Sequence, residues 1–136
     1  MKILIVEDDY TSRIVLHRFL LPFGVTEIAV TGNQAISAFA LALKGREPFD
    51  LVCLDIMLPE MDGLSVLREL RSLESDGTRE PRTHARVVMT TALNDKGNVV
   101  EAIKNCDGYL VKPIDRNRLA ACLKDFGFAP AAPDAG

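Results

Sequence analysis

The sequence predicts an α/β domain in which a parallel sheet is covered by helices on both faces. Short runs of consecutive apolar residues alternate five times with longer segments whose apolar residues recur at helical spacing. The runs are too short for helices, and an unbroken apolar run is typical of a strand buried on both faces. Strands that alternate with helices along one chain form a parallel sheet covered by helices on both faces.

Five apolar runs mark the predicted strands. The first reads KILIV and has no polar residue after Lys2, whereas the third (FDLVCLD) and fourth (RVVMTTA) carry polar residues at their ends. The predicted strands cover residues 2–6, 27–30, 49–55, 86–92 and 108–112.

Five helices are predicted between and after these strands from their apolar stripes. The first helix ends near Pro22 and Gly24, which both interrupt helices. The second is expected at residues 33–43, with Gly45 just past its end. The stripes that mark the helices are Ile14, Val15, Phe19 and Leu20; Ile36, Phe39, Ala40 and Leu43; Leu64, Leu67 and Leu70; Val99, Val100 and Ile103; and Leu119, Cys122, Leu123 and Phe126.

Two polar or low-complexity segments lie outside this alternation. Residues 74–85 (ESDGTREPRTHA) predict a surface loop, and residues 129–136 (APAAPDAG) predict a disordered tail. A chain of 136 residues with 48% hydrophobic residues suits one core and leaves no room for a second domain. We therefore expect one domain over residues 1–128.

Charge and cysteine content limit the classes of function. A net charge of −3 provides no basic surface for direct nucleic-acid binding. The three cysteines are scattered and form no CxxC pair, so we expect reduced thiols, without a disulfide framework or a zinc site. His17 and His84 have no metal-ligand spacing and are predicted at the surface. The apolar ILIV run is too short for a signal peptide or a membrane anchor, which favours a soluble, cytoplasmic protein.

Polar residues follow four of the predicted strands. The acidic triplet Glu7–Asp9 follows the first strand, Asp55 ends the third, Thr91 lies at the end of the fourth and Lys112 ends the fifth. Ligands of open parallel sheets bind at the carboxyl ends of the strands, where these side chains meet. Taken alone, each has an ordinary structural explanation: a helix N-cap in the triplet, a turn hydroxyl, a surface lysine. Asp62 is more plausibly the N-cap of the following helix than a ligand.

Converging carboxylates repel each other unless positive charge compensates for them. Lys112 supplies one positive charge, and oxygen ligands without a nearby histidine or cysteine suit Mg2+. A carboxylate is also a competent nucleophile for phosphoryl transfer, with the cations neutralising the transferred group and a hydroxyl donating to it. Asp55, central at a strand end, is the best candidate for this nucleophile.

The segments ILIVEDD, LDIMLPEMDG, VVMTTA and GYLVKP, in this order, resemble the receiver domain of bacterial two-component response regulators over residues 2–126. The resemblance implies a flavodoxin-like fold with strand order 2-1-3-4-5. It implies that Asp55 accepts a phosphoryl group from a histidine kinase or a histidine phosphotransfer protein. Mg2+ (or Mn2+) would then bind Asp55, Asp8, Glu7 through water, and the Met57 carbonyl, which leaves Asp9 outside the site.

The resemblance also assigns the switch residues. Thr91 corresponds to the switch hydroxyl and Tyr109 to the aromatic residue that turns inward. Without the resemblance, an ordinary half-buried aromatic residue near a strand end is the alternative interpretation of Tyr109. Lys112 would contact the phosphoryl group, with a cis bond to Pro113. Phosphorylation would remodel the face formed by the fourth helix, fifth strand and fifth helix, roughly residues 95–126.

We expect a stand-alone switch, not an enzyme, that acts only on its own phosphorylation and docks on a target protein such as a chemotaxis or motility component. A phosphorelay intermediate or phosphate sink is the alternative. A phosphatase of the haloacid dehalogenase type is a remote alternative, because such enzymes need an aspartate where this chain has Met57. Apolar Met57 and Leu93 border the position of the hydrolytic water in the family, which predicts a long-lived phosphorylated state.

Overall fold

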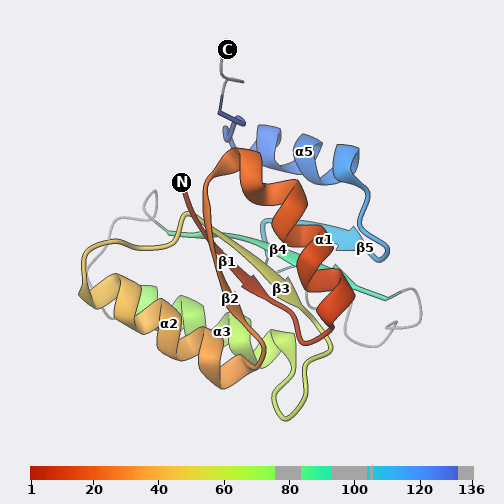
Figure 1. The fold of residues 1–136 in the computed structure, drawn as a ribbon. Coiled ribbons are helices and arrows are strands. Elements are labelled where there is room, and N and C mark those ends of the chain that lie inside the picture. The colour runs from red at the N-terminus through yellow and green to blue at the C-terminus, as the bar shows by residue number, and fades with distance from the viewer. Residues whose placement is uncertain (76–83, 93–103, 105, 132–136) are drawn as a thin grey trace.

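A computed structural model describes residues 1–75, 84–92, 104 and 106–131. Five parallel strands form one sheet in the order β2-β1-β3-β4-β5, which confirms the predicted fold class and strand order (Figure 1). Four of the predicted helices are described, and the fourth in chain order, around Val99 to Ile103, lies outside the described residues. None of the helices in the described ranges is both long and apolar enough to cross a bilayer.

The strands match the apolar runs closely. They are β1 (Lys2–Val6), β2 (Val25–Ala29), β3 (Leu51–Asp55), β4 (Arg86–Thr91) and β5 (Gly108–Val111). β2 begins two residues before its predicted start, because Val25 pairs with Lys2 and its N–H donates to Met1 O at 2.9 Å. All five residues of β3 are buried, as its unbroken apolar run requires.

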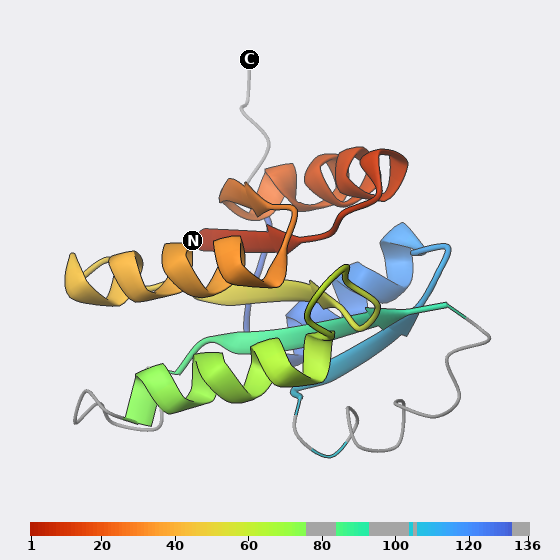
Figure 2. The ribbon, with the colours of Figure 1, turned by 90° about the horizontal axis from the view of Figure 1, so that it is seen from below.

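The helices differ from the prediction at their ends and, in the first helix, in the buried face, where Leu16 is buried and Ile14 is exposed. They are α1 (Tyr10–Leu20), followed by a 3-10 turn (Leu21–Phe23), α2 (Gly32–Lys44), α3 (Gly63–Ser75) and α5 (Arg116–Asp125). α1 and α5 cover one face of the sheet and α2 and α3 the other (Figures 1 and 2). Alternate residues of β1 serve the two layers: Ile3 and Ile5 pack under α1 and α5, and Leu4 and Val6 under α2 and α3.

The register brings the carboxyl ends of the central strands together. Val6 pairs with Leu54, and Asp55 pairs with Thr90. The residues that directly follow β1 and β5 therefore lie at the same edge of the sheet as Asp55.

The start of the predicted surface loop at residues 74–85 is wrong. α3 continues through Ser75, and the side chain of Glu74 is only 2% exposed. Its carboxylate accepts from Arg71 Nη1 and from the Ala85 N–H, each at 2.7 Å, while Arg71 Nη2 pairs with Asp107 at 2.8 Å. The buried carboxylate of Glu74 is thus paired within a network whose other members, Arg71 and Asp107, are partly exposed. Residues 76–83 lie outside the described part of the chain.

Both histidines are less exposed than expected. His17 Nδ1 lies 2.7 Å from Thr26 Oγ1, which joins α1 to β2. His84 is half-buried, with Nδ1 3.9 Å from the Glu74 carboxylate. The surface prediction failed because each ring packs against a polar partner from another element.

All three cysteines carry free thiols, and burial raises the pKa of Cys53 to about 12. Of the expected tail, residues 129–131 are described, and the Ala131 N–H donates to Pro22 O at 2.8 Å. These tail residues therefore contact the domain at the end of α1.

Candidate functional site

Asp55 occupies the end of the central strand β3 and is only 4% exposed. Its Oδ1 accepts from the Met57 N–H at 3.0 Å, and its Oδ2 accepts from Lys112 Nζ at 3.1 Å. Buried neighbours on both sides fix the strand, so the carboxylate is presented from a rigid support. Both of its oxygens accept a hydrogen bond.

Glu7 directly follows β1 and is fully buried. Its backbone N–H donates to Ala29 O at 3.1 Å, and its Oε1 forms an ion pair with Lys112 Nζ. Burial, together with the nearby Asp55 carboxylate, raises the pKa of Glu7 from 4.5 to about 7, although Lys112 opposes this rise. Glu7 is therefore the carboxyl group here that most needs a cation in order to ionise.

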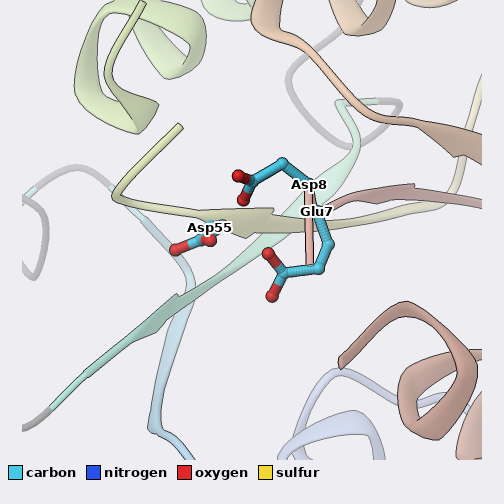
Figure 3. A group of neighbouring side chains, drawn as sticks. All are labelled: Glu7, Asp8 and Asp55. Carbon is cyan, nitrogen blue, oxygen red and sulfur yellow. The ribbon is translucent and has the colours of Figure 1, made fainter. Parts of the chain in front are cut away.

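Asp8 completes an acidic group with Glu7 and Asp55. One oxygen from each of the three carboxylates lies within 4.8 Å of the others, and Figure 3 shows them gathered beyond the ends of β1 and β3. Asp8 is exposed, so the group opens to solvent on its side. Two buried carboxylates and one exposed carboxylate form a donor set of hard oxygen atoms, which fits Mg2+ with water completing its ligands.

Lys112 is the cation of the site and directly follows β5. Its backbone N–H donates to Thr91 O at 2.7 Å, and its bond to Pro113 is cis, the isomer that the resemblance implied. Burial alone would lower the pKa of Lys112, but the carboxylates of Glu7 and Asp55 outweigh burial and raise it. The ammonium group therefore remains charged between the two carboxylates.

Thr91 and Tyr109 lie on the neighbouring strands β4 and β5. Thr91 is buried at the end of β4, and its Oγ1 donates to Ala92 O at 3.2 Å. Tyr109 is half-buried on β5, pairs with Met89 and packs against the core beneath α2 and α3. The structure thus places the hydroxyl at the sheet edge and the aromatic ring two residues before the end of β5.

Other residues predicted near the site have distinct positions. Asp9 is the N-cap of α1, where its carboxylate accepts from Ser12 N–H at 2.9 Å, a bond that lowers its pKa. The Met57 side chain is 55% exposed beside Asp55. Leu93 lies outside the described residues.

Sequence reasoning missed two contacts of this region. Arg13 Nη1 donates to Asp8 O at 2.9 Å, so a cation from α1 supports the acidic turn. Gly63, the first residue of α3, lies against the backbone of Asp55. The Asp62–Gly63 pair indicates a helix start, and Asp62 does accept from Ser65 N–H at 2.8 Å. Nothing in the sequence indicates that Gly63 contacts β3.

Comparison with known proteins agrees with this geometry. The response regulator receiver domain model matches residues 3–124. The chemotaxis protein CheY of Bacillus subtilis (strain 168) is 31% identical over 125 residues, which cover 90% of this chain and 93% of that protein. The probable transcriptional regulator ycf27 of Porphyridium aerugineum is 34% identical over 125 residues, which cover 90% of this chain and 46% of that protein.

A solved structure shares the fold. The crystal structure of a CheY-like response regulator receiver domain protein from Methanospirillum hungatei JF-1 superposes with a TM-score of 0.73 at 26% identity. The superposition covers 92% of this chain and 91% of that one.

Proposed function

Because this chain belongs to the response regulator receiver domain family, we propose that Asp55 accepts a phosphoryl group from a histidine kinase or a histidine phosphotransfer protein. The observation that supports this role is the setting of Asp55: a buried strand end, with Lys112 on one carboxylate oxygen and Glu7 and Asp8 beside it. As a receiver domain, the chain is a signalling switch.

The proposed reaction moves one phosphoryl group. A carboxylate oxygen of Asp55 attacks the phosphorus atom, a P–O bond forms, and the bond from phosphorus to the donor's imidazole nitrogen breaks. The electron pair of that bond stays on the imidazole nitrogen. Hydrolysis reverses the state: water attacks phosphorus, and inorganic phosphate leaves with regeneration of the Asp55 carboxylate.

The charged residues around Asp55 would stabilise the transferred group. Mg2+ (or Mn2+), when bound, neutralises negative charge on the phosphoryl oxygens. We propose that Asp8 and Asp55 bind the ion directly, Glu7 through water, and Met57 through its backbone carbonyl. Lys112, already held beside Asp55, would pair with a phosphoryl oxygen.

The switch would then use Thr91 and Tyr109. The Thr91 hydroxyl would donate to the phosphoryl group, and Tyr109 would pack inward, which changes the face of roughly residues 95–126. Residues 95–103 and 105 of this face lie outside the described part of the chain. β5 supports the proposal because Tyr109 lies on this strand and Lys112 directly follows it, so the same strand links the site to the aromatic residue.

We also propose that this switch acts as a stand-alone cytoplasmic regulator that binds a target protein and does not contact nucleic acid directly. The match that spans 93% of the Bacillus subtilis chemotaxis protein supports this form and makes a chemotaxis or motility target the leading candidate. A phosphorelay intermediate is the second candidate, and transfer of the phosphoryl group from Asp55 to another histidine protein would identify it.

One experiment tests the phosphoryl-accepting role. Wild type, Asp55→Asn and Asp9→Asn are incubated with acetyl phosphate and Mg2+, and phosphorylation is followed by intact-mass spectrometry. Wild type and Asp9→Asn should each gain one phosphoryl group, because the Asp9 carboxylate caps α1 and the substitution keeps the backbone N–H that donates to Glu7, and Asp55→Asn should gain none. An unmodified wild type, or a modified Asp55→Asn variant, would overturn the proposal.

A further inference from the structure

We propose that Gly63 is a positioning residue for the Asp55 carboxylate, because its missing side chain lets α3 begin directly against the backbone of β3. This inference rests on the proposed function of Asp55. It concerns how the chain holds that carboxylate in place.

The space beside Gly63 is filled by backbone atoms. A Cβ added at Gly63 would lie 2.3 Å from Asp55 O, 2.7 Å from Ile56 Cα and 3.0 Å from Asp55 C. Real Cβ atoms do not approach other atoms this closely, so either α3 or the end of β3 would have to move. β3 is the central strand and is buried throughout, which leaves it little freedom to adjust.

Gly63 is required for space and not for an unusual backbone conformation. Among the glycines that the structure describes, Gly127 is the one whose φ lies in the left-handed region, at 88°. Gly63 lies outside the left-handed region, so a larger residue would meet no backbone strain there. The helix start itself is provided by Asp62, which caps it. The close approach is therefore the feature that demands glycine.

This approach clamps the peptide that follows Asp55. The Gly63 N–H donates to Ile56 O at 2.7 Å, and the Ile56 N–H donates to Thr90 O at 3.0 Å. Ile56 is thus held by α3 on one side and by β4 on the other. Its neighbours along the chain, Asp55 and Met57, share this restraint.

The clamp reaches the carboxylate through one further hydrogen bond. Met57, directly after Ile56, donates its N–H to Asp55 Oδ1 at 3.0 Å. A shift of Ile56 would move this donor, and with it the orientation of the carboxylate and the proposed Met57 carbonyl ligand. Displacements of about 1 Å at reacting groups can lower rates by roughly 100-fold.

Gly32 offers a matched control in the same layer of helices. A Cβ at Gly32 would lie 2.8 Å from Val66 Cγ2 and 3.2 Å from the Met61 side chain, so it too is crowded. Its neighbours are side chains of α3 and of the turn before it, not the backbone of Asp55. Gly32→Ala should therefore disturb packing without moving the carboxylate.

The test compares Gly63→Ala, Gly32→Ala and wild type in the full chain. Phosphorylation rates with acetyl phosphate and Mg2+ binding by calorimetry are measured at a temperature where circular dichroism shows each variant folded. Gly63→Ala should be phosphorylated roughly 10- to 100-fold more slowly and should bind Mg2+ more weakly. Losses of this size are typical when a residue that orients a metal ligand is replaced. Gly32→Ala should melt at a lower temperature with an unchanged rate and Mg2+ affinity.

Two results would overturn the inference. The first is a Gly63→Ala variant that keeps the wild-type rate and Mg2+ affinity while losing stability as Gly32→Ala does. The second uses wild type alone, in case Gly63→Ala does not fold. If the amide hydrogen of Gly63 exchanges with solvent as fast as an amide in an open loop, its hydrogen bond to Ile56 O does not restrain the chain. If wild type is not phosphorylated, the proposed function fails, and the Mg2+ measurement still tests Gly63.

Discussion

Among single residues, Lys112 provides the positive charge that compensates for the carboxylates of the site. Its ammonium group lies between the buried carboxylates of Glu7 and Asp55, so one positive charge faces two potential negative charges. Burial and the Asp55 carboxylate raise the pKa of Glu7 by more than Lys112 lowers it, so this one positive charge does not compensate fully. A metal ion would supply the missing positive charge, and its binding must therefore depend on pH.

We predict that Mg2+ affinity rises with pH up to about 7, the raised pKa of Glu7. Below this pH the carboxyl group holds a proton that the metal must displace, which weakens binding by up to about tenfold per pH unit. Above it, Glu7 is ionised and gives no further change. Calorimetric titration of wild type across this range checks the slope, and Glu7→Gln should flatten it. A slope that persists in Glu7→Gln would assign the proton to another group.

The Met57 side chain leads to a second residue-scale prediction. Met57 is 55% exposed and lies close to Asp55 in the chain. We propose that Met57 and Leu93 together restrict the water that hydrolyses the phosphoryl group. Replacing both by polar residues, Met57→Asn with Leu93→Glu, should speed loss of the phosphoryl group by roughly tenfold or more, because polar groups orient water for attack. Decay of the phosphorylated protein after removal of acetyl phosphate measures the rate. An unchanged rate would show that these side chains do not control that water.

At the scale of elements, we expect the helix caps to contribute to stability and not to phosphoryl transfer. Asp62 caps α3 by accepting from Ser65 N–H at 2.8 Å. Asp62→Ala should lower the free energy of unfolding by about 1 kcal/mol, because a helix N–H loses its partner, and Asp62→Asn should keep most of that stability. Urea denaturation of both variants measures the difference. Equal stability of the two would mean that the cap contributes nothing.

The elements were predictable where local patterns decide them. The buried run of β3 and the existence of α1 and α2 needed no knowledge of distant contacts. The buried face of α1 was predicted only in part, because Ile14 is exposed and Leu16 is buried. Strand-end polarity was enough to gather Glu7, Asp55 and Lys112 in one prediction. The end of α3 was not predictable, because Glu74 is held by a network with distant partners. The close approach of Gly63 to β3 likewise depends on how α3 packs, which no sequence spacing encodes.

At the scale of the whole molecule, polar networks occupy both ends of the sheet. Opposite the acidic group, Asp107 accepts from Val87 N–H and from Arg71 Nη2, each at 2.8 Å, and pairs with Arg86 at 3.3 Å. This carboxylate ties the starts of β4 and β5 to α3. Stability at this end should therefore be independent of chemistry at the other.

Asp107→Ala tests that separation. It should lower the free energy of unfolding by about 2 kcal/mol, since the N–H of the buried Val87 and Nη2 of Arg71 both lose this acceptor, and should leave phosphorylation of Asp55 unchanged. Arg86→Ala is the control: its side chain is 51% exposed, so its loss should change stability by less than about 1 kcal/mol. Thermal denaturation and mass spectrometry provide the two readouts. A slower phosphorylation of Asp107→Ala would show that the two ends communicate.

The bond from Ala131 to Pro22 determines how this protein can be handled. α1 starts beside the acidic turn and runs away from it for 11 residues, roughly 16 Å, to the turn that contains Pro22. A fluorophore or surface linker joined after Ala131 would leave the molecule near that distal turn. Immobilised through this point, the protein would present Asp55 to the solution, which makes the C-terminal side the natural choice for tethering in binding measurements.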